Sequence, residues 1–328
     1  MGAKVSVIVP IYKVEDFISR CANSLLRQTM TDLEYIFVND ATPDASVEKL
    51  LEVLQQYPKR SAKVKIVHHE KNKGLPSARN TGLSIATGEY VFHCDADDYV
   101  DSIMLETLYN AAVNNNADIV YCDWYLSFNK TERYMRQPKY DSPCEAVKAM
   151  LGGAMKYNVW NKLVKKAVYE NNKLLFPDGY GMGEDMTMII AFINATRIKY
   201  VHKAFYHYVK TNTSAFTQSF SHKNLVDLQY NVSRVENEIH KHYGTSLEKE
   251  LAFLKLETKF PLLIMGTNHE QYREWTALYP ESNKYIWQNK YISFRSRMLE
   301  WLACKRQWWL VELYYLLVIR FVYGVLYK

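Results

Sequence analysis

The pattern of apolar and polar positions divides the first 125 residues into two kinds of segment. Short apolar runs that end at turn-forming residues are typical of buried strands, and apolar residues at helical spacing lie between them. We expect strands over 5–9, 33–38, 64–68, 90–94 and 118–124, and helices over 15–28, 44–57, 77–86 and 104–114. Such alternation predicts βαβ units and a mostly parallel mixed sheet flanked by helices. Asp44 is expected to cap the second helix.

The pattern changes after residue 125. Proline and glycine interrupt it between 130 and 178, after which a helix is expected over 186–194 and a strand over 198–208. From residue 224 the spacing predicts successive helices, with breaks near Gly266 and Pro280. We therefore expect one α/β domain over 1–215, with halves 1–125 and 126–215. A helical region over 216–328 follows it and could serve a membrane-surface or dimer contact.

Composition narrows the class of protein. The chain has 328 residues, of which 48% are hydrophobic and 23% charged, as in ordinary globular proteins. Its net charge of +6 includes no compact run of Lys or Arg, which argues against nucleic acid as a partner. The five cysteines form no CxxC pair, which argues against a zinc or redox motif and suits a reducing compartment. No charged region followed by an apolar signal core opens the chain, so a cytoplasmic location is expected.

Acidic residues follow the strand expected over 90–94. Asp95, Asp97 and Asp98 lie within four positions, where their charges repel unless a cation or charged ligand offsets them. Carboxylates together with diphosphate oxygens are typical ligands of Mg²⁺ or Mn²⁺. The carboxyl ends of strands are also where ligands bind in open α/β sheets. We assign Asp95 and Asp97 to a metal or nucleotide site, whereas Asp98 has the alternative of a first-turn helix acid.

Two further residues near strand ends have open alternatives. Asp40 can accept a hydrogen bond from a base or ribose, or it can stabilise the turn before Thr42-Pro43. Arg79 lies in a loop that leads into a helix, which is a favourable place to bind an anion. The alternative for Arg79 is a surface ion pair.

A glycine-rich loop precedes a second acidic pair. Gly179, Gly181 and Gly183 come just before Glu184 and Asp185, and such a loop is typical of a mobile or closely approached backbone. One of the two acids could be a general base. The alternative is that both stabilise the N-terminus of the following helix.

Taken together, these motifs resemble the family 2 glycosyltransferases, which are inverting enzymes with the GT-A fold. The resemblance covers about residues 4 to 210, and Asn39 and Ala41 depart from the Asp-Asp-Gly-Ser pattern more usual in the family. The matching motifs are 5–12, 38–44, 72–82, 88–98 and the pair 184–185.

The resemblance implies transfer of a sugar from a nucleotide diphosphate, with UDP expected, to an acceptor hydroxyl in cell-surface polysaccharide or glycolipid synthesis. Asp185 would take the proton from the acceptor, and Mn²⁺ or Mg²⁺ would stabilise the departing diphosphate. The other roles implied are base contacts by Pro10, Tyr12 and Asp40, nucleotide contact by Arg79, ribose or diphosphate contact by Asp95, metal binding by Asp97 with Asp95, and an acceptor contact by Glu184.

Two aromatic segments have less certain roles. Trp160 would lie on the acceptor side, where it could stack on a sugar face or pack in the core. His207 could reach the diphosphate, although a lone histidine in an aromatic strand is more often structural.

The segment 308–323 is apolar and aromatic, with Lys305, Arg306 and Lys328 beside it. Glu312 and Arg320 within it make a membrane span costly. An interfacial helix on the inner face of the cell membrane fits better, with a lipid-linked oligosaccharide as acceptor. Packing on the body of the protein or on a second copy in a homo-oligomer is the alternative, and removal of residues 304–328 is expected to separate the two.

The rival function is a non-catalytic nucleotide-sugar-binding or scaffold protein of the same fold. A sugar-phosphate nucleotidyltransferase or an NAD enzyme is disfavoured, because 10–14 contains no glycine after the first strand. Turnover of a UDP-sugar with Mn²⁺, lost in Asp185→Asn while nucleotide binding survives, would separate enzyme from binder.

Overall fold

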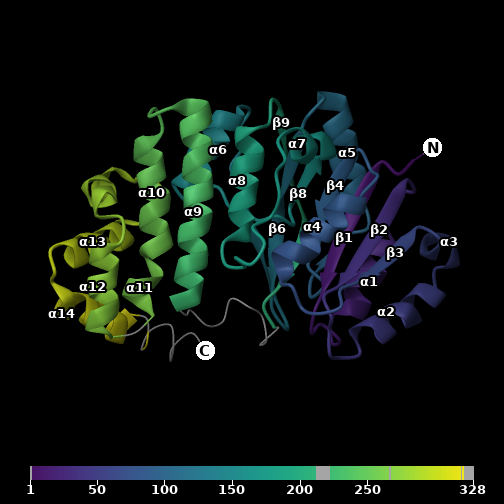
Figure 1. The fold of residues 1–328 in the computed structure, drawn as a ribbon, viewed down its shortest axis with the longest axis horizontal. Coiled ribbons are helices and arrows are strands. Elements are labelled where there is room, and N and C mark those ends of the chain that lie inside the picture. Colours follow the sequence, from purple (N-terminus) through teal and green to yellow (C-terminus); the bar gives the residue numbers. More distant parts are fainter. Residues whose placement is uncertain (1, 212–221, 266, 319, 321–328) are drawn as a thin grey trace. The chain divides into compact units, whose positions relative to one another are not determined.

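The computed structural model describes residues 2–211, 222–265, 267–318 and 320 (Figure 1). The chain divides into two compact units. Unit 1 comprises Met1–Ala146 and Tyr157–Ser219, and unit 2 comprises Val147–Lys156 and Phe220–Lys328. Each unit is described by itself.

Unit 1 is built on a mixed sheet with the strand order β3-β2-β1-β4-β8-β6-β9-β5, and β7 pairs with β6 off this path. The pairs β1–β2, β2–β3, β1–β4 and β6–β9 are parallel. The strand β8 is antiparallel to both β4 and β6, and the pairs β5–β9 and β6–β7 are also antiparallel. The strands are β1 (Val5–Ile11), β2 (Leu33–Asn39), β3 (Val64–His68), β4 (Tyr90–His93), β5 (Tyr99–Val100), β6 (Ile119–Ser127), β7 (Glu132–Met135), β8 (Lys162–Lys165) and β9 (Ile198–Val209).

The strand order reverses at β1, which lies between β2 and β4. Ile11 of β1 is opposite Asn39 of β2, and Ile8 is opposite His93 of β4. The carboxyl ends of β1, β2 and β4 therefore meet at one edge of the sheet. Connections diverge at such a switch point, so ligands have room to bind there.

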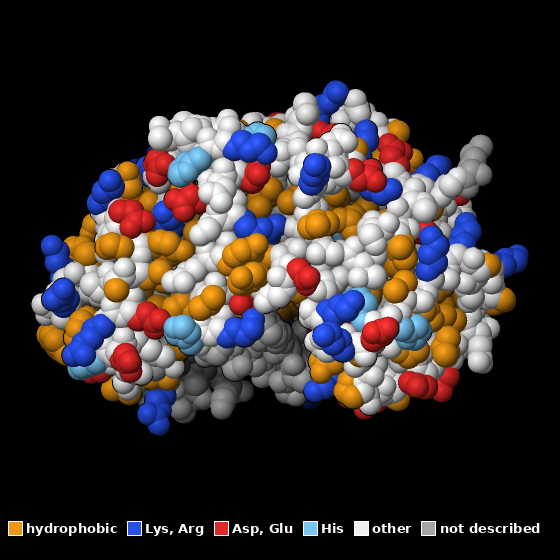
Figure 2. Space-filling model, in the orientation of Figure 1, with side chains coloured by type: hydrophobic (Ala, Val, Ile, Leu, Met, Phe, Trp, Pro, Cys, Tyr) orange, Lys and Arg blue, Asp and Glu red, His pale blue; other side chains and the backbone are white. Residues whose placement is uncertain are grey.

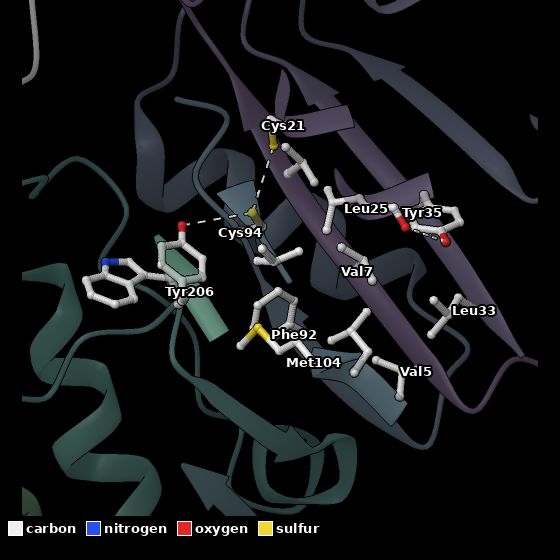
Figure 3. Close-up of a cluster of buried hydrophobic side chains, with 14 of the residues drawn as sticks. Val5, Val7, Cys21, Leu25, Leu33, Tyr35, Phe92, Cys94, Met104 and Tyr206 are labelled. Atoms are coloured by element: carbon white, nitrogen blue, oxygen red, sulfur yellow. Dashed lines mark hydrogen bonds between the residues drawn. The ribbon is translucent and has the colours of Figure 1, made fainter. Parts of the chain in front are cut away.

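Helices flank this sheet, and one buried apolar cluster joins α1 to it. Figure 3 shows Val7 of β1, Leu25 of α1 and Phe92 of β4 in this cluster. The Sγ atoms of Cys21 and Cys94 lie here at a hydrogen-bonding distance of 3.9 Å, and no disulfide joins them. The helices of this part of the chain are α1 (Ile18–Leu26), α2 (Ser46–Gln55), α3 (Pro58–Ser61), α4 (Leu75–Ile85), α5 (Met104–Asn115), α6 (Pro143–Leu151), α7 (Lys166–Asn171), the 3-10 helix η1 (Glu184–Met186) and α8 (Thr187–Ile193).

The structure confirms a mixed sheet with flanking helices and corrects two details. The sheet beyond β4 is less parallel than the alternation predicts, because β8 inserts in the opposite direction. The second helix begins at Ser46, so Asp44 is not its N-cap. Instead, Asp44 Oδ1 accepts hydrogen bonds from the Ser46 amide at 3.3 Å and the Ser46 hydroxyl at 2.6 Å, and Oδ2 accepts from the Glu15 amide at 3.1 Å.

Unit 2 is helical, as expected. Its core includes Tyr272 and Trp275, and Lys259 Nζ lies 4.1 Å from the centre of the Trp275 ring. No helix in the described residues is both long enough and apolar enough to cross a bilayer. Of the expected segment 308–323, residues 319 and 321–323 lie outside the described residues. The helices are α9 (His222–Tyr243), α10 (Glu248–Lys259), α11 (Pro261–Ile264), α12 (His269–Ala277), the 3-10 helix η3 (Pro280–Gln288), α13 (Phe294–Cys304) and α14 (Trp308–Tyr314).

Candidate active site

Asp40, at the end of β2, ties that strand to the loop before α4. It is 3% exposed. Its Oδ1 accepts from the Lys73 amide at 2.8 Å and lies 2.6 Å from His69 Nδ1, and its Oδ2 accepts from the Gly74 amide at 2.8 Å. The turn itself is held by Asn39, whose Oδ1 accepts from the Thr42 amide at 2.9 Å. These contacts give Asp40 a structural role, and its contact with a base stays a prediction.

Residues of α4 hold the segment that leads to the second acidic pair. Asn80 donates to the Phe176 carbonyl and accepts from the Phe176 amide, both at 2.9 Å. Ser77 donates to Asp178. Gly183 then adopts a φ of 84° immediately before Glu184, a conformation that other residues rarely take. The glycine-rich loop is therefore fixed at one end by α4 and turns sharply into η1.

Arg79 connects the two acidic motifs from the buried face of α4. Its side chain is 1% exposed, and Nη2 donates to Asp95 Oδ1 at 2.9 Å. Burial lowers the pKa of Arg79, but the charges of Asp95, Glu184 and Asp185 outweigh burial and raise it. Its Nε and Nη1 atoms are buried without a hydrogen-bond partner among the described residues. The surface ion pair weighed for Arg79 is excluded, because the pair is largely buried.

Asp98 differs from the two acids before it. It is fully buried, and it accepts hydrogen bonds from the Tyr206 hydroxyl and the Val209 amide, both at 2.7 Å. Burial, followed by the charges of Asp97 and Asp95, raises its pKa well above the usual range. Asp98 therefore fastens the acidic loop to β9, a role that neither alternative from the sequence included.

Tyr208 of β9 marks where the carboxylates converge. Its pKa is raised by burial and by the charges of four acids. Those acids are Asp98, Asp95, Asp97 and Asp185. The structure thus brings the two acidic motifs, more than eighty residues apart in sequence, into one electrostatic environment.

Glu184 and Asp185 are charged less readily than ordinary carboxyls. Burial, then the charge of Asp185, raises the pKa of Glu184 to about 8. Burial raises the pKa of Asp185 to about 6, with Arg79 opposing the rise and Asp95 adding to it. Asp185 Oδ1 has no hydrogen-bond partner among the described residues. A carboxylate with a free oxygen and a pKa near neutrality suits proton abstraction.

Lys162, for which the sequence predicted no role of its own, lies within electrostatic reach of Asp185. It is 1% exposed, and its Nζ donates to the Asn158 carbonyl at 2.6 Å and to Asn161 Oδ1 at 2.8 Å. Burial lowers its pKa to about 7, while the charge of Asp185 raises it. A lysine that begins a buried strand directly after Trp-Asn was the available signal, because buried lysines are rare without a charged partner.

Trp160 and His207 have surroundings that favour their structural alternatives. Trp160 is 5% exposed and stacks on Tyr206 and Tyr208, with ring centroids 4.4 and 5.2 Å away. His207 Nδ1 lies 2.7 Å from Glu132 and Nε2 lies 3.2 Å from Asp101. Both nitrogens of His207 thus face carboxylates. The acceptor role of Trp160 and the diphosphate role of His207 stay predictions.

The residues that border the expected base lie at the end of β1. Pro10 is half-buried, whereas Tyr12, just beyond the strand, is 41% exposed, with Lys13 Nζ 5.3 Å from the centre of its ring. An exposed aromatic ring at a switch point can stack on a planar base.

Asp95 and Asp97 are the carboxylates expected to bind a metal ion. The side chain of Asp95 is 24% exposed and Asp97 is half-buried. Asp98, in contrast, accepts a hydrogen bond from Tyr206 of β9. Within the described residues, no three His, Cys, Asp or Glu side chains are grouped to hold a metal ion. A cation held by Asp95 and Asp97 would need further oxygen ligands, such as those of a diphosphate and water, and their role as metal ligands stays a prediction.

Comparisons with known proteins bear on this site. The family model described as "Glycosyl transferase family 2" matches residues 6–182. The chain is 37% identical to the uncharacterized glycosyltransferase EpsJ of Bacillus subtilis, over 65% of this chain and 63% of that protein. It is 30% identical to the cholesterol galactosyltransferase of Borreliella burgdorferi, over 69% of this chain and 65% of that protein. These matches span less than two thirds of each relative's length.

A solved structure is similar over nearly the whole chain. The crystal structure of S. aureus TarS 1–349 in complex with UDP-GlcNAc aligns with a TM-score of 0.72 at 20% identity. The alignment covers 95% of this chain and 91% of that chain. At this identity the similarity establishes a shared fold.

Proposed function

The chain belongs to glycosyl transferase family 2, and on that premise we propose that it transfers a sugar from a nucleotide diphosphate donor to an acceptor hydroxyl with inversion at the anomeric carbon. One observation carries this proposal. Asp95 and Asp97, at the carboxyl end of β4, share the surroundings of Tyr208 with Asp185, which follows the glycine-rich loop. This shared environment supports a single site for the proposed donor-binding and proton-accepting groups.

Asp185 is the proposed general base. Its free Oδ1 accepts the proton of the acceptor hydroxyl as that oxygen attacks the anomeric carbon from the face opposite the leaving group. Glu184, whose pKa is raised to about 8, is mostly protonated at neutral pH and can donate a hydrogen bond to the acceptor. The difference between the two pKa values supports Asp185 as the proton acceptor and Glu184 as the hydrogen-bond donor.

Arg79 and Tyr12 position the donor in this proposal. Arg79 fixes the orientation of Asp95 through their 2.9 Å contact, and its unpartnered Nε and Nη1 atoms suit an anionic ligand. Tyr12 stacks on the base, with Pro10 beside it. Bound at Asp97 and Asp95, Mn²⁺ or Mg²⁺ would neutralise charge on the departing diphosphate.

UDP is the proposed nucleotide, because the similar TarS structure holds UDP-GlcNAc. The sugar is a hexose or an N-acetylhexosamine. A sugar or lipid-linked oligosaccharide is the proposed acceptor, in polysaccharide or glycolipid synthesis at the inner face of the cell membrane. A sterol acceptor in the name of one relative is in keeping with an acceptor at a membrane.

Turnover of a panel of nucleotide sugars with Mn²⁺ tests the proposal. The wild-type chain should hydrolyse or transfer from one donor, and Asp185→Asn should lower the rate by about 10²–10⁴ while leaving nucleotide affinity unchanged. Asp141→Asn, at an acid whose side chain is 82% exposed, is the control for removing a carboxylate. No turnover of any donor by a chain that binds the nucleotide would favour the non-catalytic alternative.

A further inference from the structure

An exposed aromatic patch lies on unit 2, on residues that precede the segment 308–323 in the sequence. Phe294, Met298 and Trp301 fall on one face of α13, and they are 63%, 37% and 38% exposed. Trp287 of η3, 42% exposed, joins them with its ring 5.7 Å from Phe294 and 6.2 Å from Trp301. We call these four residues the aromatic patch. Large apolar side chains gathered in solvent mark a surface that binds something.

The stretch of chain that carries the aromatic patch is rich in basic residues. Between residues 284 and 306 the only acid is Glu300, which is 1% exposed, so the charged side chains that reach solvent here are basic. The basic residues are Lys284, Lys290, Arg295, Arg297, Lys305 and Arg306. Figure 2 shows hydrophobic side chains together with Lys and Arg, and with some Asp, Glu and His, over the region that Figure 1 labels α12, α13 and α14.

This combination selects among possible partners. Tryptophan and phenylalanine favour the interfacial region of a bilayer, and basic residues are attracted to anionic headgroups. A two-fold contact with a second copy would place the same basic residues against one another, which disfavours it. A bilayer satisfies the apolar rings and the positive charges at once.

We propose that the aromatic patch and its basic surround bind the surface of an anionic phospholipid bilayer. The helix after it extends the same chemistry, because Trp309 and Leu313 of α14 are 62% and 45% exposed. This inference deepens the proposed peripheral location and does not depend on the transfer chemistry. It assigns the contact to α13 and η3 as well as to α14.

Sedimentation of the full chain with vesicles tests the inference. The chain should bind phosphatidylcholine vesicles that contain phosphatidylglycerol and should bind pure phosphatidylcholine weakly. In the double variant Phe294→Ser with Trp301→Ser, we expect binding to the anionic vesicles to fall roughly 10-fold or more. The matched control replaces Leu51 and Val113 of unit 1 with serine, because they are similarly exposed at 47% and 50%, and it should bind as the wild type does.

A second pair of variants tests the electrostatic part. Arg295→Gln and Lys305→Gln should each weaken binding to anionic vesicles roughly 5-fold at low salt, and added salt should shrink the difference. Equal binding by wild type and patch variants, or no preference for anionic lipid, would overturn the inference. So would patch variants that change only the oligomeric state measured by light scattering.

Donor hydrolysis without vesicles is measured on every variant. Retained hydrolysis with lost vesicle binding is the result expected of the patch variants. Wild-type chain that hydrolyses a donor but ignores vesicles would refute the membrane contact alone. Wild-type chain that binds vesicles but hydrolyses no donor would refute the proposed function alone.

Discussion

Lys162 is buried beside the acidic pair, and its charge opposes the rise in the pKa of Asp185. Activity should fall below pH 6, because the base must be ionised and its pKa is raised to about 6. Lys162→Met removes the opposing cation, so the acid limb of the kcat profile should move up by about one pH unit. Lys165→Met is the control, since that side chain is 30% exposed and faces Glu89. If the acid limb of the kcat profile did not move in Lys162→Met, Lys162 would have no effect on the pKa of Asp185.

The buried hydroxyl of Tyr206 holds the acidic loop on β9. It donates to Asp98 at 2.7 Å and accepts from the Asp95 amide at 3.1 Å. Tyr206→Phe leaves those buried groups without this partner and should lower the free energy of unfolding by about 1–3 kcal/mol in urea denaturation. Tyr169→Phe is the matched control, because the Tyr169 hydroxyl is buried with no partner among the described residues. Equal effects of the two substitutions would contradict this role.

At the scale of elements, α4 carries the geometry of the site. Asn80→Ala removes both hydrogen bonds to Phe176 and frees the start of the glycine-rich loop. Because this misplaces Asp185 relative to the donor, kcat should fall about 10- to 100-fold. Asn115→Ala on α5 also loses a side-chain bond, to Ala111 at 2.8 Å, and should leave kcat unchanged. A normal kcat in Asn80→Ala would show that the loop is positioned without α4.

The apolar pattern was sufficient for the strands β1 to β4 and for α1, α2 and α4 between them, but not for the short helix α3. The family fold, now confirmed, followed from the motifs. The apolar pattern did not predict β5, β7 or β8. The strand β5 has only two residues, and β7 and β8 contain charged residues, whereas β4, which is equally short, contains none. The family motifs also led to the acids that the structure brings together. The partners of Asp40, Asp98 and Asp185 could not be predicted, since each comes from a distant part of the chain.

At the scale of the whole molecule, unit 2 limits one test suggested by the sequence. Removing residues 304–328 would delete Val311, which is fully buried in the core of unit 2. A truncated chain could lose membrane binding by unfolding rather than by losing a contact. Substitution of exposed residues such as Trp309 and Leu313 keeps Val311 in place and is the cleaner experiment.

In the proposed mechanism, carboxylates at the end of β4 hold a cation and, through it, the donor diphosphate. Calorimetric titration of the chain with UDP, with and without Mn²⁺, measures this coupling. We expect Mn²⁺ to raise UDP affinity at least about 10-fold, a coupling of roughly 1.4 kcal/mol. Asp97→Asn should abolish the gain, and Asp141→Asn, an exposed acid elsewhere in unit 1, should keep it. Equal UDP affinity with and without Mn²⁺ in the wild-type chain would contradict metal-mediated binding of the donor.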